Sequence, residues 1–146
     1  MALKALLVAQ DRQFADRFTK ALGSHTKGCG KIHYSDNIDT ALYLASHRLP
    51  EAIFIDEEFG ESDINRFISE LRREMPHSVH IMMTNGRGRS ALRKALKVGA
   101  RDYLVKDELC PTEFDRCLWG LYVGAVSRYA AKQSQAVRSP SVLLDY

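Results

Sequence analysis

Three side chains of complementary chemistry, a carboxylate, a hydroxyl and an ammonium, each follow or close a short apolar run. They are Asp56, which ends the run 52–56, Thr84, which closes the run 79–83, and Lys106, which follows the run 103–105. Such runs are typical of strands buried on both faces of a parallel sheet, and the carboxyl ends of these strands form one edge, where ligands bind. Together the three groups could accept a phosphoryl group. The carboxylate would be the nucleophile, the lysine would balance charge, and the hydroxyl would donate to a phosphoryl oxygen. The alternative is that Asp56 only caps the following turn.

The elements that must position these residues alternate along the chain. We expect strands at 3–8, 32–34, 52–56, 79–83 and 103–105, each followed by a helix. Asp11 is expected to cap the first helix, and Ser35 or Asp36 the second, which Leu49-Pro50 should stop. Five strands that alternate with five helices predict an α/β fold, with a doubly wound parallel sheet covered by helices on both faces.

Length and composition are those of one globular domain, with 146 residues, of which 45% are hydrophobic and 27% charged. The longest apolar runs are too short to cross a bilayer, and the N-terminus does not resemble a signal peptide. Three cysteines without a CxxC motif indicate reduced thiols, so we expect a cytoplasmic protein without a zinc site. Residues 1–130 are expected to form the domain and residues 131–146 a helical extension, tail or linker. The chain could be a whole protein or the first domain of a longer one.

A family resemblance is carried by Asp56, Thr84 and the run Val98-Gly99-Ala100-Arg101-Asp102-Tyr103-Leu104-Val105-Lys106. This pattern resembles the receiver domain of bacterial two-component response regulators, over about residues 3–130. The resemblance implies a CheY-like, flavodoxin-like (βα)5 sheet with strand order 2-1-3-4-5. It also implies that Asp56 is the phosphoacceptor, Thr84 the switch hydroxyl, Tyr103 the switch aromatic and Lys106 the lysine that contacts the phosphoryl group.

The chain departs from this family pattern after the first strand, where receivers bind Mg²⁺ through an acidic pair. Ala9 and Gln10 occupy these positions. Alanine cannot ligate a metal, and a neutral amide is a poor replacement for a carboxylate on a hard dication. Mg²⁺ binding is therefore expected to be weak or absent, and no cofactor is expected to be required. The remaining candidate ligands are Gln10, Asp11, Asp56 and Glu58. A further departure is Asp107 where proline usually follows the lysine, so the bond between Lys106 and Asp107 is expected to be trans.

Charge and aromatic residues indicate a partner surface. Residues 51–63 hold six acids and no base, whereas residues 85–106 hold seven bases and one acid, which indicates either a basic docking face or a solvated helix surface. The last expected helix, which begins at Pro111-Thr112, carries a second apolar stripe beside the stripe that faces the core. This second stripe either binds a partner or is covered by a neighbouring helix or the tail. The expected interface residues are Arg89, Arg93, Lys97, Trp119, Tyr122, Val126 and Tyr129.

Two readings of the function stay open. In the first, the chain is an atypical receiver, or pseudo-receiver, that signals through protein contacts, with weak or no Mg²⁺-dependent phosphorylation. In the second, a histidine kinase phosphorylates it on Asp56. Neither makes it an enzyme. The partner would be a kinase, an output domain or a second copy. A bound anion or nucleotide near residues 86–90 is a further alternative. Direct nucleic-acid binding is not expected, and no glycine-rich loop follows the first strand, as a dinucleotide-binding or flavin-binding protein would need.

Overall fold

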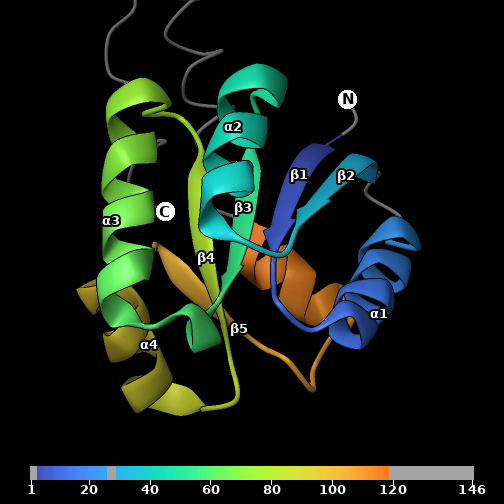
Figure 1. Cartoon of the computed structure of the whole chain (residues 1–146). Coiled ribbons are helices and arrows are strands. Elements are labelled where there is room, and N and C mark those ends of the chain that lie inside the picture. The colour runs from blue at the N-terminus through green and yellow to red at the C-terminus, as the bar shows by residue number, and fades with distance from the viewer. Residues whose placement is uncertain (1–2, 26–28, 119–146) are drawn as a thin grey trace, which may run out of the picture.

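The protein is built on a single five-stranded parallel sheet. The computed structural model describes residues 3–25 and 29–118. The strands lie in the order β2-β1-β3-β4-β5, as the family resemblance implies (Figure 1). Their bounds are β1 Leu3–Val8, β2 Cys29–Ser35, β3 Ala52–Asp56, β4 Val79–Thr84 and β5 Asp102–Val105.

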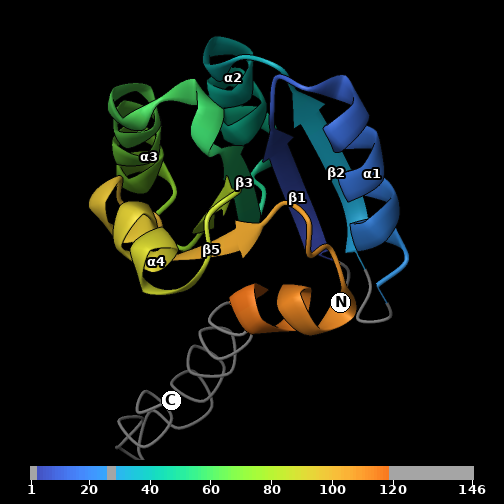
Figure 2. The same cartoon turned by 90° about the horizontal axis from the view of Figure 1, so that it is seen from below.

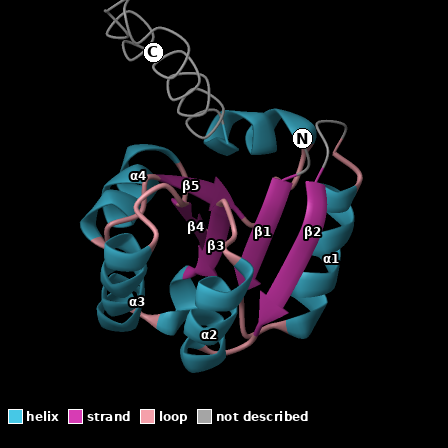
Figure 3. Cartoon of the chain, turned by 90° about the horizontal axis from the view of Figure 1, so that it is seen from above, coloured by secondary structure: helices cyan, strands magenta, loops and turns pink. Residues whose placement is uncertain are grey.

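Helices cover both faces of the sheet. Helix α1 and the helical residues 111–118 lie on one face, and α2, α3 and α4 lie on the other (Figures 2 and 3). Their bounds are α1 Arg12–Gly23, α2 Ile38–Arg48, α3 Glu61–Glu74 and α4 Gly88–Lys97, and a short 3-10 helix, η1, spans Glu57–Phe59. The predicted doubly wound α/β architecture is therefore confirmed.

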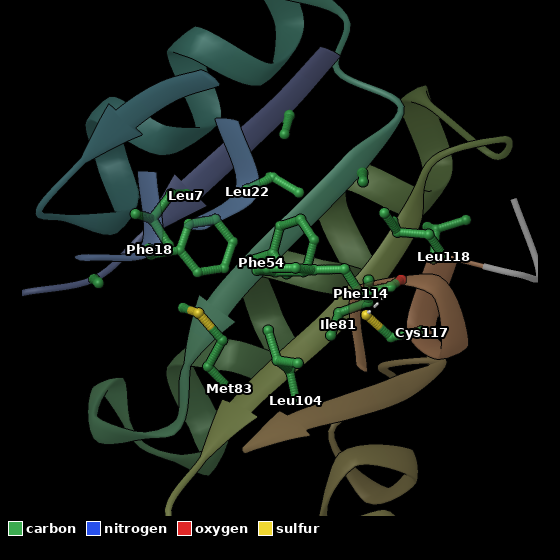
Figure 4. Close-up of a cluster of buried hydrophobic side chains, with 14 of the residues drawn as sticks. Leu7, Phe18, Leu22, Phe54, Ile81, Met83, Leu104, Phe114, Cys117 and Leu118 are labelled. Atoms are coloured by element: carbon green, nitrogen blue, oxygen red, sulfur yellow. Dashed lines mark hydrogen bonds between the residues drawn. The ribbon is translucent and has the colours of Figure 1, made fainter. Parts of the chain in front are cut away.

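Strand β3 lies between β1 and β4 and is buried along its whole length. Its side chains alternate between two cores, because successive residues of a strand point to opposite faces. Phe54 packs against Phe18 of α1, with ring centroids 4.9 Å apart, and Phe18 in turn packs edge-on against Phe114 (Figure 4). Ile53 and Ile55 belong to the core beneath α2 and α3. This two-sided packing is what the apolar run before Asp56 predicts.

The start of α2 differs from the sequence-based expectation. Asn37 is the N-cap and accepts from the Thr40 N–H at 2.8 Å. Neither expected residue caps the helix, because the Ser35 hydroxyl bonds to the backbone of Asn37 and Asp36 accepts from the Asn37 side chain. The strand β2 is also longer than the expected 32–34. The expected stop is confirmed: α2 ends at Arg48, and Leu49 adopts φ 50° in the left-handed region.

None of the helices in residues 3–25 and 29–118 has the length and apolar composition needed to cross a bilayer.

Candidate functional site

The carboxylate of Asp56 lies at the end of β3 and is fully buried. Its Oδ2 atom is 2.6 Å from Lys106 Nζ, and its Oδ1 atom accepts from the Glu58 N–H at 3.0 Å. Burying a charge is costly unless it is paired, so the lysine is the group that makes an ionised carboxylate tolerable here. The structure thus brings together the acid and the base that the sequence placed at two separate strand ends.

Lys106 follows β5, and its backbone N–H donates to the Thr84 carbonyl at 2.9 Å, which fixes the start of its loop to β4. The ammonium group has two further neighbours. Glu58 Oε1 lies 3.7 Å from Nζ, and the Phe14 ring centroid lies 5.5 Å away. The described residues contain no cis peptide bond, which confirms the expected trans bond between Lys106 and Asp107.

Thr84 is buried at the end of β4, but its hydroxyl does not bond to Asp56. It donates to Glu57 Oε1 at 2.9 Å and accepts from the Gly86 N–H at 2.9 Å. The other oxygen of Glu57 accepts from the Asn85 N–H at 2.8 Å. Sequence reasoning missed this role of Glu57, because nothing in the run of three acids distinguishes it from Glu58.

The end of β1 supplies few metal ligands. Ala9 is fully buried, and its carbonyl accepts the Tyr34 hydroxyl at 2.8 Å, whereas Gln10 is exposed. The Oδ1 atom of Asp11 accepts from the Gln13 and Phe14 N–H groups and so caps α1, as predicted.

A divalent cation at this edge would need several oxygen ligands, preferably charged ones. Within residues 3–25 and 29–118, no three His, Cys, Asp or Glu side chains are grouped so that they could hold a metal ion. Of the four candidate ligands, Asp56 is paired with Lys106, Asp11 is used as a cap, and Gln10 and Glu58 are exposed. Weak Mg²⁺ binding stays a prediction.

Tyr103 of β5 is partly buried and is held by an arginine that the sequence did not single out. Arg116 lies 4.8 Å from the Tyr103 ring centroid and donates to the Tyr103 carbonyl at 2.7 Å. It also donates to both carboxylate oxygens of Asp102, at 2.9 and 2.8 Å. A guanidinium that lies over the Tyr103 ring, and whose Nη1 atom donates to both oxygens of the Asp102 carboxylate, has little freedom. The Tyr103 side chain is therefore fixed from the side of residues 111–118.

The expected partner surface is only partly described. Arg89, Arg93 and Lys97 lie exposed on α4, and Lys97 pairs with Glu61 at 3.4 Å. Leu92 and Leu96 on the same helix are 37% and 56% exposed, which the sequence analysis did not anticipate. The aromatic part of the predicted surface, Trp119, Tyr122, Val126 and Tyr129, lies outside the described residues.

Comparison with known proteins decides the family. Residues 5–112 match the family model described as the response regulator receiver domain. The chain belongs to this family. It is therefore a receiver domain of two-component signalling. No curated protein sequence matches the chain significantly.

Solved receiver structures share the fold at low sequence identity. The signal receiver domain of NarL from Mycobacterium tuberculosis is 20% identical, with a TM-score of 0.66; the match covers 82% of this chain and 94% of that one. A response regulator from Thermotoga maritima is 19% identical, with a TM-score of 0.69, covering 82% and 99%. The chemotaxis protein CheY4 from Vibrio cholerae is 18% identical, with a TM-score of 0.67, covering 83% and 99%.

Proposed function

We propose that this receiver is an atypical one, which signals in the cytoplasm mainly through protein contacts and is phosphorylated weakly or not at all. The observation that carries the proposal is the identity of the residues at the end of β1. Ala9 has no ligating side chain, its carbonyl accepts the Tyr34 hydroxyl, and the Asp11 carboxylate is used as the cap of α1. A phosphoryl group that moves to Asp56 brings negative charge to an edge that already holds three adjacent acids. Without a metal ion, Lys106 alone would have to balance it.

The contact surface in this proposal is α4 together with the segments beside it. Its described part combines two exposed leucines, Leu92 and Leu96, with two exposed arginines, Arg89 and Arg93. Apolar side chains surrounded by arginine are the usual composition of an interface centre. The surface suits a kinase, an output domain or a second copy of the chain that offers acidic residues around an apolar patch.

A working phosphoacceptor is the second candidate, because the Asp56–Lys106 pair is in place at 2.6 Å. An Asp56 oxygen would attack the phosphorus atom of a donor, and the bond from phosphorus to the leaving atom would break. Its electron pair would stay on that atom, which is an imidazole nitrogen in a phosphohistidine and an oxygen in acetyl phosphate. Lys106 would move from the carboxylate to the transferred group. No cofactor other than a weakly held Mg²⁺ ion enters this scheme.

A Mg²⁺ titration followed by amide NMR spectra tests the proposal. Millimolar Mg²⁺ should leave the amide signals around Asp56 nearly unchanged in the wild type. The double variant Ala9→Asp/Gln10→Asp should bind Mg²⁺ at least tenfold more tightly, about 1.4 kcal/mol. Asp11→Asn is the matched control, because asparagine caps a helix as well as aspartate does but lacks the charge.

Tight Mg²⁺ binding by the wild type would overturn the proposal, and weaker binding by Asp11→Asn would identify Asp11 as a ligand. Incubation with acetyl phosphate separates the two candidate functions. Rapid, complete labelling of the wild type that is lost in Asp56→Asn would favour the phosphoacceptor.

A further inference from the structure

The carboxylate of Glu57 holds the last residue of β4 and the first residue of the loop that leads to α4. Its Oε1 atom accepts the Thr84 hydroxyl at 2.9 Å, and its Oε2 atom accepts the Asn85 backbone N–H at 2.8 Å. Hydrogen bonds to an ionised carboxylate are roughly twice as strong as those between neutral groups. One side chain of η1 therefore fixes the point at which the chain leaves the sheet toward α4.

Glu57 and a phosphoryl group on Asp56 would compete for the hydrogen bond that the Thr84 hydroxyl donates. A hydroxyl has a single proton to donate. In the structure that proton goes to Glu57, and the hydroxyl oxygen accepts from the Gly86 N–H. A phosphoryl group on Asp56 could receive the Thr84 hydrogen bond only if Glu57 released it.

The surroundings of Glu57 provide a second place for its side chain. A cavity of about 190 Å³ lies between α3 and α4, and Glu57 is part of its lining. Lys94 of α4 lines the same cavity and offers a cation, whereas the other acid of the lining, Glu61, is paired with Lys97 at 3.4 Å. A carboxylate displaced from Thr84 therefore has both space and an opposite charge within the groove that it already borders.

We propose that Glu57 is a positioning residue that takes the Thr84 hydroxyl in place of a phosphoryl group, and so holds residues 84–87 in one arrangement while Asp56 is unmodified. This inference deepens the proposed function and rests on it, since a receiver whose output surface works without phosphorylation needs another anion to fix this loop. Helix α4 begins at Gly88, directly after the loop. Its exposed leucines and arginines are thereby presented in a constant position.

Amide hydrogen exchange of the full chain tests the inference, in buffer without Mg²⁺ or phosphodonor. Glu57→Ala should accelerate exchange of the Asn85 amide at least tenfold, because it removes both oxygens that accept from Asn85 and Thr84. The Met82 amide within β4 serves as the reference for global unfolding and should be unchanged. Glu58→Ala is the matched control: it is the same change one residue away, at a side chain that lies 3.7 Å from Lys106 Nζ.

Unchanged exchange at Asn85 in Glu57→Ala would overturn the inference, as would an equal acceleration in Glu58→Ala, which would indicate a general charge effect. If Glu57→Ala does not fold, Thr84 carries the test. Thr84→Val removes the hydroxyl and should accelerate exchange at Asn85, whereas Thr84→Ser keeps the donor and should preserve the wild-type rate. Equal rates in these two variants would refute the role of the hydroxyl. These measurements use no metal, so tight Mg²⁺ binding would overturn the proposed function without deciding this one.

Discussion

Replacing Asp56 and replacing Lys106 should lower the free energy of unfolding by different amounts, although the two residues form one ion pair. The two residues are 2.6 Å apart, but their surroundings differ. Asp56 is fully buried at the end of a central strand and cannot reach water. The Lys106 side chain is 10% exposed, and its flexible stem gives it a second acceptor in Glu58, whose side chain is 52% exposed.

Lys106→Met would leave the Asp56 carboxylate buried, with the hydrogen bond from the Glu58 N–H but without its cation. Breaking a buried pair from one side costs about 3–5 kcal/mol, and the slight exposure of Lys106 places this variant near 3 kcal/mol. Asp56→Asn keeps an oxygen for that N–H, and Lys106 can turn to Glu58 and to solvent. The expected loss for Asp56→Asn is about 1 kcal/mol or less, the size of a partly exposed contact.

Urea unfolding at pH 7, followed by circular dichroism, measures both losses, and a double variant closes the comparison. Asp56→Asn/Lys106→Met removes both charges, so its stability should lie well above that of Lys106→Met alone. Equal losses in the two single variants would refute the reasoning, as would a double variant less stable than Lys106→Met. Either result would mean that the carboxylate finds a partner other than Lys106.

Three further predictions concern single residues. Burial, with a smaller contribution from Arg72, lowers the pKa of His80 from 6.5 to about 4. Between these pH values only the unfolded chain binds the proton, so the free energy of unfolding should fall by up to about 3 kcal/mol as the pH drops from 6.5 to 4. His80→Gln should remove that part of the pH dependence of the urea midpoint. Burial also raises the pKa of Cys117 to about 12, so a maleimide should label the exposed Cys110 in the native protein and Cys117 only on unfolding, as peptide mass spectrometry would show. Asp11→Ala should cost about 1 kcal/mol in thermal or urea unfolding through the lost cap of α1, and Asp11→Asn almost nothing.

Much of the fold could be predicted because its signals are local. Strands β1 and β3 have the bounds that their apolar runs indicate, and Asp11 caps α1 as its residue type suggests. The prediction for the cap of α2 was wrong because Ser35, Asp36 and Asn37 are all good capping residues. Which of them caps depends on how the turn after β2 bonds to itself, and a list of residue preferences does not contain that information.

Only the site residues that lie at the ends of strands could be predicted. Asp56 and Lys106 meet because parallel strands bring their carboxyl ends to one edge. Glu57 and Arg116 escaped prediction because their roles depend on the direction of a side chain after a turn or along a helix. Their partners, Thr84 and Tyr103, lie far away in the sequence, and neither spacing nor composition marks these contacts.

The position of Lys106 has a consequence for how the chain assembles. Asp56 lies in the middle of the sheet, whereas Lys106 follows β5, which is an edge strand and, of the five strands in the described residues, the last to be synthesised. A partly formed sheet of β1 to β4 would bury the carboxylate without its cation, which is unfavourable. Such an intermediate is therefore penalised, and docking of the edge strand is coupled to formation of the centre. The charge pair that defines the site also makes folding of the sheet more nearly all-or-none.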